Sequence, residues 1–121
     1  MLGRMSVAMP VINPRERQAG GCCEAAVIPD LKPTQAEQLA ALVKALADPT
    51  RLRIVDAVRK ASPEALCQCE LLPLFDMSQA AVAKHLKLLI GAGVLGSERR
   101  GTWTYYYLRP DGLKELTTWL S

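Results

Sequence analysis

Residues 77–108 constrain the fold of this chain more than any other stretch. Ser78 has the hydroxyl group expected of a helix N-cap. The apolar positions that follow recur at helical spacing and are Val82, Ala83, Leu86, Leu89 and Ile90. Gly91 and Gly93 are typical of a helix end. Residues 94–99 and 102–108 predict two strands joined by a turn at Arg100 and Gly101. The sequence therefore predicts a helix followed at once by a β-hairpin.

The outward face of this predicted helix combines small, amide-bearing and cationic side chains. Ala80, Lys84 and Lys87 lie opposite the apolar stripe, and Gln79 and His85 flank them. A helix that enters the major groove of DNA needs little bulk at its leading end, hydrogen-bonding groups for base edges and positive charge for phosphates. This face therefore favours contact with double-stranded DNA, with the lysines on phosphates.

Positive charge is concentrated in the same stretch. Residues 78–109 contain five basic side chains and one acid, a net charge of +4, whereas the whole chain carries only +3. Arg99 and Arg100 lie at the hairpin tip. Lysines on a helix are often only a solvated face, but an excess of charge on one element is what a nucleic-acid-binding surface shows.

Length and composition predict one small, mainly helical domain. The chain has 121 residues, half of them hydrophobic and only six aromatic, which suits packed helices that dimerisation would help to stabilise. No apolar run approaches the roughly 20 residues needed to span a bilayer. The first residues lack the apolar core of a signal peptide. We therefore expect a cytoplasmic protein with no membrane partner, in which thiols stay reduced.

The order of predicted elements indicates a winged helix-turn-helix. Residues 1–33 form a flexible arm because prolines and the Gly20-Gly21 pair interrupt it. The folded domain, residues 34–121, begins with a helix capped by Thr34 and Glu37. Further helices are expected at 49–60, at 67–75 with a bend at Pro73, and at 111–120. A short helix, a tight turn, a longer helix and a hairpin wing give an α+β fold that is mainly α.

Two cysteine pairs are candidates for metal or redox chemistry. Cys67 and Cys69 open the short helix, whose N-terminus should lower thiol pKa values and favour the thiolates that bind metals. Cys22 and Cys23 lie far upstream in the arm, so folding or dimerisation would have to bring the pairs together. A soft ion that accepts three thiolates, a redox switch and incidental thiols all remain open. Structural zinc is disfavoured because neither pair has the usual spacing.

Four segments resemble the ArsR/SmtB family of metal-responsive repressors, in order across residues 35–116: LADPTRLRIVDAV, ALCQCELL, MSQAAVAKHLKLLIGAGVL and RRGTWTYYYL. The resemblance implies a winged-helix homodimer joined through its first and last helices, which leaves its operator when an ion binds. Residues implied to lie on the DNA-reading helix or wing are Ser78, Gln79, Lys84, His85, Arg99 and Arg100. Residues implied to orient the second helix are Asp48, Pro49 and Arg51.

Cys67 and Cys69 match the Cys-x-Cys of the family's thiolate sensors, but three positions depart from the family pattern. Ala80 and Ala83 stand where hydroxyl residues are common, and Leu72 stands where the best-known arsenic sensors have a third cysteine. The third ligand would then come from Cys22 or Cys23, as in related sensors that recruit N-terminal cysteines. The final helix also lacks the histidines of the family's zinc site.

Together these features predict a metalloid-responsive repressor that binds operator DNA as a homodimer. Arsenite, As(III), or antimonite, Sb(III), would bind thiolates and release the DNA; the predicted ligands are Cys22, Cys23, Cys67 and Cys69. A response to cadmium, Cd(II), or lead, Pb(II), through four thiolates is one alternative. A thiol redox sensor and an interaction module without DNA affinity are others. An enzyme is not expected, because the chain has a single histidine, no phosphate-binding loop and no evident nucleophile–base pair.

Overall fold

The computed structural model describes residues 11–14 and 27–121. The chain divides into two compact units, residues 1–30 and 31–121, and the second contains the helices and strands of the described residues. Cys22 and Cys23 lie outside the described residues. The same described part contains no helix both long and apolar enough to cross a membrane.

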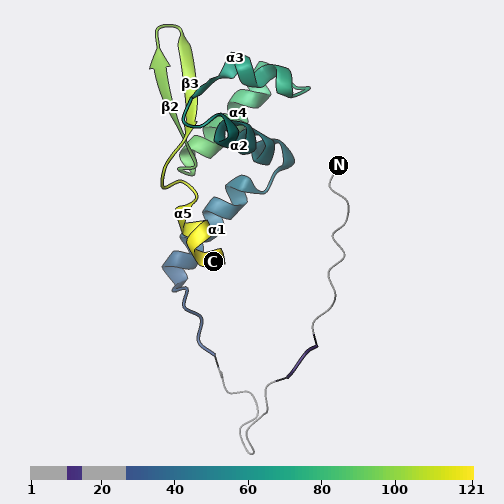
Figure 1. Ribbon diagram of the computed structural model, residues 1–121, viewed down its shortest axis with the longest axis vertical. Helices are drawn as coiled ribbons and strands as arrows, with labels where there is room; N and C mark the ends of the chain where they lie inside the picture. Colours follow the sequence, from purple (N-terminus) through teal and green to yellow (C-terminus); the bar gives the residue numbers. More distant parts are fainter. Residues whose placement is uncertain (1–10, 15–26) are drawn as a thin grey trace, which may run out of the picture. The chain divides into compact units, whose positions relative to one another are not determined.

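The second unit has the predicted winged helix-turn-helix order (Figure 1). The helices are α1 (Pro33–Leu46), α2 (Pro49–Ala61), α3 (Gln68–Leu71), the 3-10 turn η1 (Leu72–Leu74), α4 (Gln79–Gly91) and α5 (Lys114–Leu120). The strands are β1 (Leu66–Cys67), β2 (Leu95–Arg100) and β3 (Trp103–Leu108), in the antiparallel order β1-β3-β2. The predicted α+β fold with a hairpin wing is confirmed, and so is the bend near Pro73, where α3 gives way to η1.

The wing has one face in the core and one face outside. Tyr106 is buried, whereas Trp103 and Tyr107 on the same strand are exposed and Tyr105 is half-buried. This alternation follows from the two-residue period of a strand. The strand β1 was not predicted, because two residues are too few to show a period.

The core is made where α2, α4 and the base of the wing meet. Its most deeply buried side chains are Ile54, Val58, Leu71, Val82, Leu86, Leu89, Val94 and Leu95. The predicted apolar stripe of α4 is confirmed at Val82, Leu86 and Leu89, but Ala83 is exposed. His85, which was predicted on the outward side, is half-buried. The fully buried stripe of α4 is therefore narrower than predicted.

Two helix starts differ from the prediction. Helix α1 begins at Pro33 with Lys32 as its N-cap, and Gln35 Oε1 accepts from the backbone N–H of Lys32 at 3.0 Å. The predicted cap at Thr34 is therefore wrong, since proline fits the first position of a helix and sets the start one residue earlier. Helix α5 begins at Lys114 rather than at residue 111, because the preceding residues form a turn closed by the Gly112 N–H and the Arg109 carbonyl.

Gly112 is required by a close approach of two backbone segments. A Cβ at this position would lie 2.7 Å from the carbonyl oxygen of Val94 and 3.0 Å from that of Gly93. Because these atoms are backbone, Gly112→Ala is expected to lower the free energy of unfolding by about 1–3 kcal/mol. The matched control Gly91→Ala, where a Cβ meets nothing within 4 Å, should stabilise the helix by about 0.5–1 kcal/mol. Urea denaturation followed by circular dichroism measures both; equal destabilisation would contradict the close approach.

Candidate nucleic-acid interface and thiol site

The N-terminus of α4 is exposed and capped as predicted. Ser78 Oγ accepts from the backbone N–H of Ala81 at 3.1 Å. The exposed residues that follow on the outward side are Gln79, Ala80, Ala83, Lys84, Lys87 and Leu88. The start of the helix is thus free of bulky side chains, and two ammonium groups project from it about one and two turns further along. This is the shape and charge that a major-groove helix needs.

His85 lies at the edge of that face, but its Nδ1 is turned toward α2. It is 3.3 Å from Arg51 Nη1 and 4.0 Å from Asp48 Oδ2, and 22% of the side chain is exposed. Arg51 Nε also donates to the carbonyl oxygen of Ala45 at 2.6 Å. The sequence pattern does not reveal these contacts, because they join residues far apart in the chain.

Asp48 is the N-cap of α2. Its Oδ2 accepts from the backbone N–H of Arg51 at 3.0 Å. This hydrogen bond is the largest cause that lowers the pKa of the Asp48 carboxyl; desolvation opposes it, and the positive charge of Arg51, with that of His85 when it is protonated, lowers the pKa further. The carboxylate is therefore the favoured form of Asp48. It lies at the start of α2 and faces His85 in α4.

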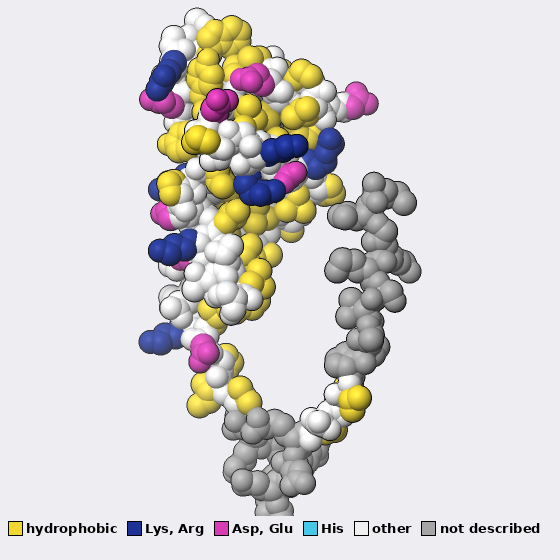
Figure 2. Space-filling view, in the orientation of Figure 1, with side chains coloured by type: hydrophobic (Ala, Val, Ile, Leu, Met, Phe, Trp, Pro, Cys, Tyr) yellow, Lys and Arg dark blue, Asp and Glu magenta, His cyan; other side chains and the backbone are white. Residues whose placement is uncertain are grey.

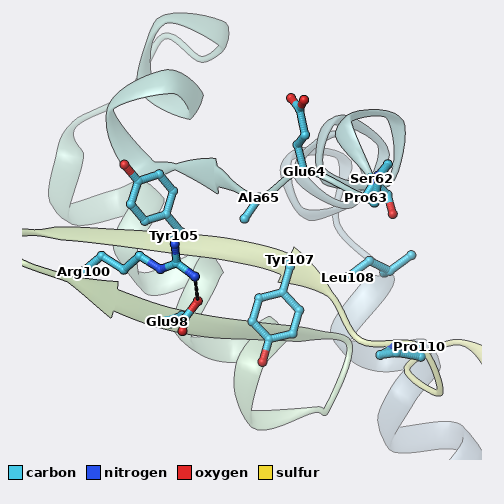
Figure 3. A pocket seen from close by; sticks show the side chains of 10 residues that line it. All are labelled: Ser62, Pro63, Glu64, Ala65, Glu98, Arg100, Tyr105, Tyr107, Leu108 and Pro110. Atoms are coloured by element: carbon cyan, nitrogen blue, oxygen red, sulfur yellow. Dashed lines mark ion pairs between the residues drawn. The ribbon is translucent and has the colours of Figure 1, made fainter.

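The two wing arginines have different surroundings. Arg100 Nη2 lies 3.3 Å from Glu98 Oε2, whereas Arg99 Nε donates to the backbone carbonyl of Gly101 at 3.3 Å. Figure 3 shows Arg100 and Glu98 beside Tyr105 on the outer face of the hairpin, in an open groove of about 710 Å³. Both arginine side chains are exposed, but Glu98 offsets part of the charge of Arg100.

The thiol pair marks the start of α3, as predicted. Cys67 is the N-cap and is 4% exposed; its Sγ accepts from the backbone N–H of Cys69 at 3.4 Å. The backbone N–H of Cys67 donates to Glu70 Oε1 at 3.0 Å, which completes the cap. Cys69 is exposed. One thiol is therefore held in the fold while the other faces solvent.

The prediction that the helix start lowers the thiol pKa values is wrong for Cys69. Hydrogen bonding with the Cys67 thiol raises the pKa of Cys69, and burial and the charges of Cys67 and Glu70 add to this effect. The helix contribution is small because α3 has only four residues and little dipole to offer.

Within residues 11–14 and 27–121, no three cysteine, histidine or acidic side chains are grouped to hold a metal ion. Leu72, at the position of the missing third cysteine, is half-buried against the core. The described residues thus supply two thiols, Cys67 and Cys69, and the other predicted ligands, Cys22 and Cys23, are outside them.

The segment Cys67-Gln68-Cys69 contacts both parts of the candidate DNA interface. Cys67 pairs with Tyr105 of the wing strand β3. Gln68 Nε2 donates to the carbonyl oxygen of Gln79, the first residue of α4, at 3.3 Å. A change at the thiols can therefore reach the wing through backbone pairing and the reading helix through one side chain. Neither contact follows from a sequence pattern.

Helices α1 and α5 contact each other and expose apolar side chains. Trp119 is 54% exposed and Leu120 is 68% exposed at the end of α5, and Val43 is exposed on α1. Figure 2 shows hydrophobic side chains along one edge of the part of the molecule formed by these helices. These side chains are therefore candidates for contact with another chain.

The chain is similar to the members of a known protein family and to solved structures. Residues 48–97 match the family described as "Bacterial regulatory protein, arsR family". An uncharacterized HTH-type transcriptional regulator of Methanocaldococcus jannaschii is 34% identical over 66% of this chain and 88% of its own length. An arsenical resistance operon repressor of Bacillus subtilis is 36% identical over 60% of this chain and 68% of its own length. The crystal structure of an ArsR family transcriptional regulator superposes with a TM-score of 0.62 at 27% identity, covering 70% of this chain and 84% of that one.

Proposed function

The chain belongs to the ArsR family of bacterial regulatory proteins, which are DNA-binding transcriptional regulators and not enzymes, and on that premise we propose that it is a cytoplasmic repressor released from its operator by arsenite or antimonite. The relative named as an arsenical resistance operon repressor supports this ligand class. The observation that carries the proposal is the position of Cys67-Gln68-Cys69 between the wing and the reading helix.

Operator binding is assigned to α4 and the wing of two subunits. Their reading helices would enter successive major grooves about 34–36 Å apart. We assign base edges to Gln79 and phosphates to the exposed cations Lys84, Lys87, Arg99 and Arg100. Ser78 Oγ caps the helix, and its hydroxyl proton is free to donate to a phosphate oxygen. For His85 the bond to Arg51 favours a positioning role over base reading.

The two lysines of α4 provide a direct test of DNA binding. Lys84→Ala and Lys87→Ala are each expected to weaken operator binding and to reduce the slope of log K against log salt by about 1.8, because each phosphate contact contributes about 0.9 and the dimer loses one contact in each subunit. Lys60→Ala, at the far end of α2, is the matched control and should leave the slope unchanged. Fluorescence anisotropy over a salt series measures these slopes. Slopes that are the same in all four proteins would contradict the assigned interface.

Homodimerisation is assigned to α1 and α5. Their exposed apolar side chains are Val43, Trp119 and Leu120. Burying a Val, Leu or aromatic side chain against a partner contributes about 1.5–3 kcal/mol. A symmetric pair of such surfaces would join the two subunits, and each subunit would then present its own α4 to the DNA.

The inducer site is assigned to three thiolates, two of them from Cys67 and Cys69. The third would come from Cys22 or Cys23, of the same subunit or the other. As(III) and Sb(III) are soft ions that accept thiolate ligands and take the place of the thiol protons. Because the pKa of Cys69 is raised, binding at neutral pH should release a proton from this thiol. The same raised pKa disfavours Cys69 as the reactive thiol in the redox alternative, since sensor cysteines need a large thiolate fraction.

The thiol site can act on DNA binding through its two contacts. Ligation would draw the Cys67 sulfur toward the ion and change the geometry of the cap that it makes with the Cys69 N–H at the start of α3. The pairing of Cys67 with Tyr105 carries the change to the wing, and Gln68 carries it to the first residue of α4. A coupling of about 2.7 kcal/mol is enough for a 100-fold loss of DNA affinity, and linkage requires DNA to weaken ion binding by the same factor.

One titration tests the proposal against its alternatives. Arsenite, antimonite, Cd(II), Pb(II) and Zn(II) are added in turn to a complex of the protein with fluorescent operator DNA. We expect release by the two metalloids, and absorption spectroscopy at the metalloid edge should show three sulfur ligands. Release only by Cd(II) or Pb(II), with four sulfurs, would support the alternative ion class. Release by peroxide without any metal would support the redox alternative.

A further inference from the structure

One guanidinium group joins three helices beside the DNA-reading surface. Arg51, in α2, donates through Nε to the carbonyl of Ala45 in α1 at 2.6 Å, and its Nη1 lies 3.3 Å from His85 Nδ1 in α4. The His85 side chain is 22% exposed, so the contact is partly shielded from water. This pair of side chains, the Arg51–His85 latch, therefore helps to set the orientation of α4 relative to α1 and α2.

The latch fixes the proton of the imidazole ring. A guanidinium has only donors, so Nδ1 must be unprotonated and the ring proton must be on Nε2. When Nδ1 takes a proton, both groups become donors and both are cations, and the hydrogen bond between them is lost. The new N–H can turn to Asp48 Oδ2, 4.0 Å away. Protonation therefore exchanges a link to Arg51 for a link to Asp48.

The charges around His85 decide the direction of the effect on DNA. Among the residues that the structure describes, the charged groups bonded to or paired with His85 are Arg51 and Asp48, both at the start of α2. Helix α1 adds Lys44 in its last turn, and α4 adds Lys84, both with exposed side chains. The charge gained at Nδ1 thus lies on the inner side of α4 against a carboxylate. The loosened position of α4 would therefore change the affinity for DNA more than the added charge does.

We propose that Arg51 and His85 are positioning residues for DNA binding, and that protonation of His85 opens the latch and weakens operator binding. This inference rests on the proposed function, in which α4 reads the operator. Because the chain has one histidine, a loss of affinity at low pH that disappears when His85 is replaced is assigned to this side chain.

The test uses a fluorescent duplex of about 30 base pairs, long enough for two half-sites, that the wild-type protein selects from a randomised pool at pH 8. Anisotropy at constant ionic strength should show wild-type binding about tenfold weaker at about pH 5.5 than at pH 8, as expected when a hydrogen bond to a charged group is lost. His85→Asn keeps an acceptor for Arg51 but cannot be protonated. Whatever its affinity at pH 8, this variant should keep the same affinity at low pH. Arg51→Gln should bind weakly at both pH values.

Two results would overturn the latch. One is an affinity that rises at low pH, and the other is an equal loss of affinity in the His85→Asn variant. Nitrogen-15 NMR of the single imidazole, without DNA, gives an independent readout: we expect the Nε2–H tautomer at pH 8, and an Nδ1–H tautomer overturns the proposal. If the wild type binds no duplex at pH 8, the proposed function is contradicted, and the NMR spectrum still decides whether the latch exists.

Discussion

Replacing both Cys67 and Cys69 with serine is expected to abolish release by arsenite while operator affinity stays within about twofold of wild type. A serine hydroxyl is a good N-cap acceptor, so α3 keeps its cap after Cys67→Ser. The soft thiolate ligands are lost, because a hydroxyl does not replace them for As(III). The wild-type protein should lose about 100-fold in affinity under the same conditions, a coupling of about 2.7 kcal/mol. Anisotropy of a fluorescent operator during an arsenite titration measures both responses.

Further variants separate loss of the ligand from loss of the fold. Cys67→Ala removes the cap acceptor as well as the ligand, and should cost about 1 kcal/mol of stability that Cys67→Ser does not. The pair Cys22→Ser and Cys23→Ser leaves only two thiolates and should also abolish release. If the Cys67→Ser, Cys69→Ser double variant still leaves its operator on addition of arsenite, the inducer site lies elsewhere. If the Cys22 and Cys23 variant responds like wild type, the third ligand is not in the arm.

The reading helix and the wing were the most predictable part of the fold. Each carries a local signal: a serine cap, apolar residues at helical spacing, two glycines and an alternating strand. Elements without a local signal were missed or misplaced. Strand β1 has two residues and exists only because β3 lies beside it. The start of α1 is set by Pro33 and not by Thr34, although a threonine hydroxyl is a favourable N-cap group.

The candidate site was predictable as a set of residue types but not as a set of contacts. The position of Cys67 and Cys69 at a helix start follows from the sequence, whereas the raised pKa of Cys69 depends on which thiol faces the other. The same is true of His85. Helical spacing places it at the edge of the outward face, but only the packing of α2 against α4 shows that Nδ1 meets Arg51. Periodicity specifies a direction around a helix axis, and a partner from another helix is not part of that pattern.

Replacing Trp119 and Leu120 together with serine is expected to convert the proposed dimer into monomers. Both side chains are already more than half exposed in the single chain, so the variant should lose little stability within a subunit. In a symmetric interface each substitution acts twice, and the loss is about 3–6 kcal/mol for each residue that is buried by the partner. Sedimentation equilibrium measures the dissociation, and circular dichroism melting checks that the monomer stays folded. Thr118→Ser, an exposed polar position on the same helix, is the control and should remain dimeric.

The same variant connects dimerisation to both DNA binding and induction. A monomer can occupy one half-site only, so operator affinity should fall by about 100-fold or more, as expected when two linked contacts are reduced to one. If the double variant stays dimeric, α5 is not the interface. The folded monomer also shows where the thiolates come from. If the Cys22 and Cys23 variant has placed the third ligand in the arm, three sulfur ligands to As(III) in the monomer indicate an arm that reaches Cys67 and Cys69 of its own subunit, whereas two sulfur ligands indicate the arm of the partner. Dimer formation would then be a condition for induction as well as for repression.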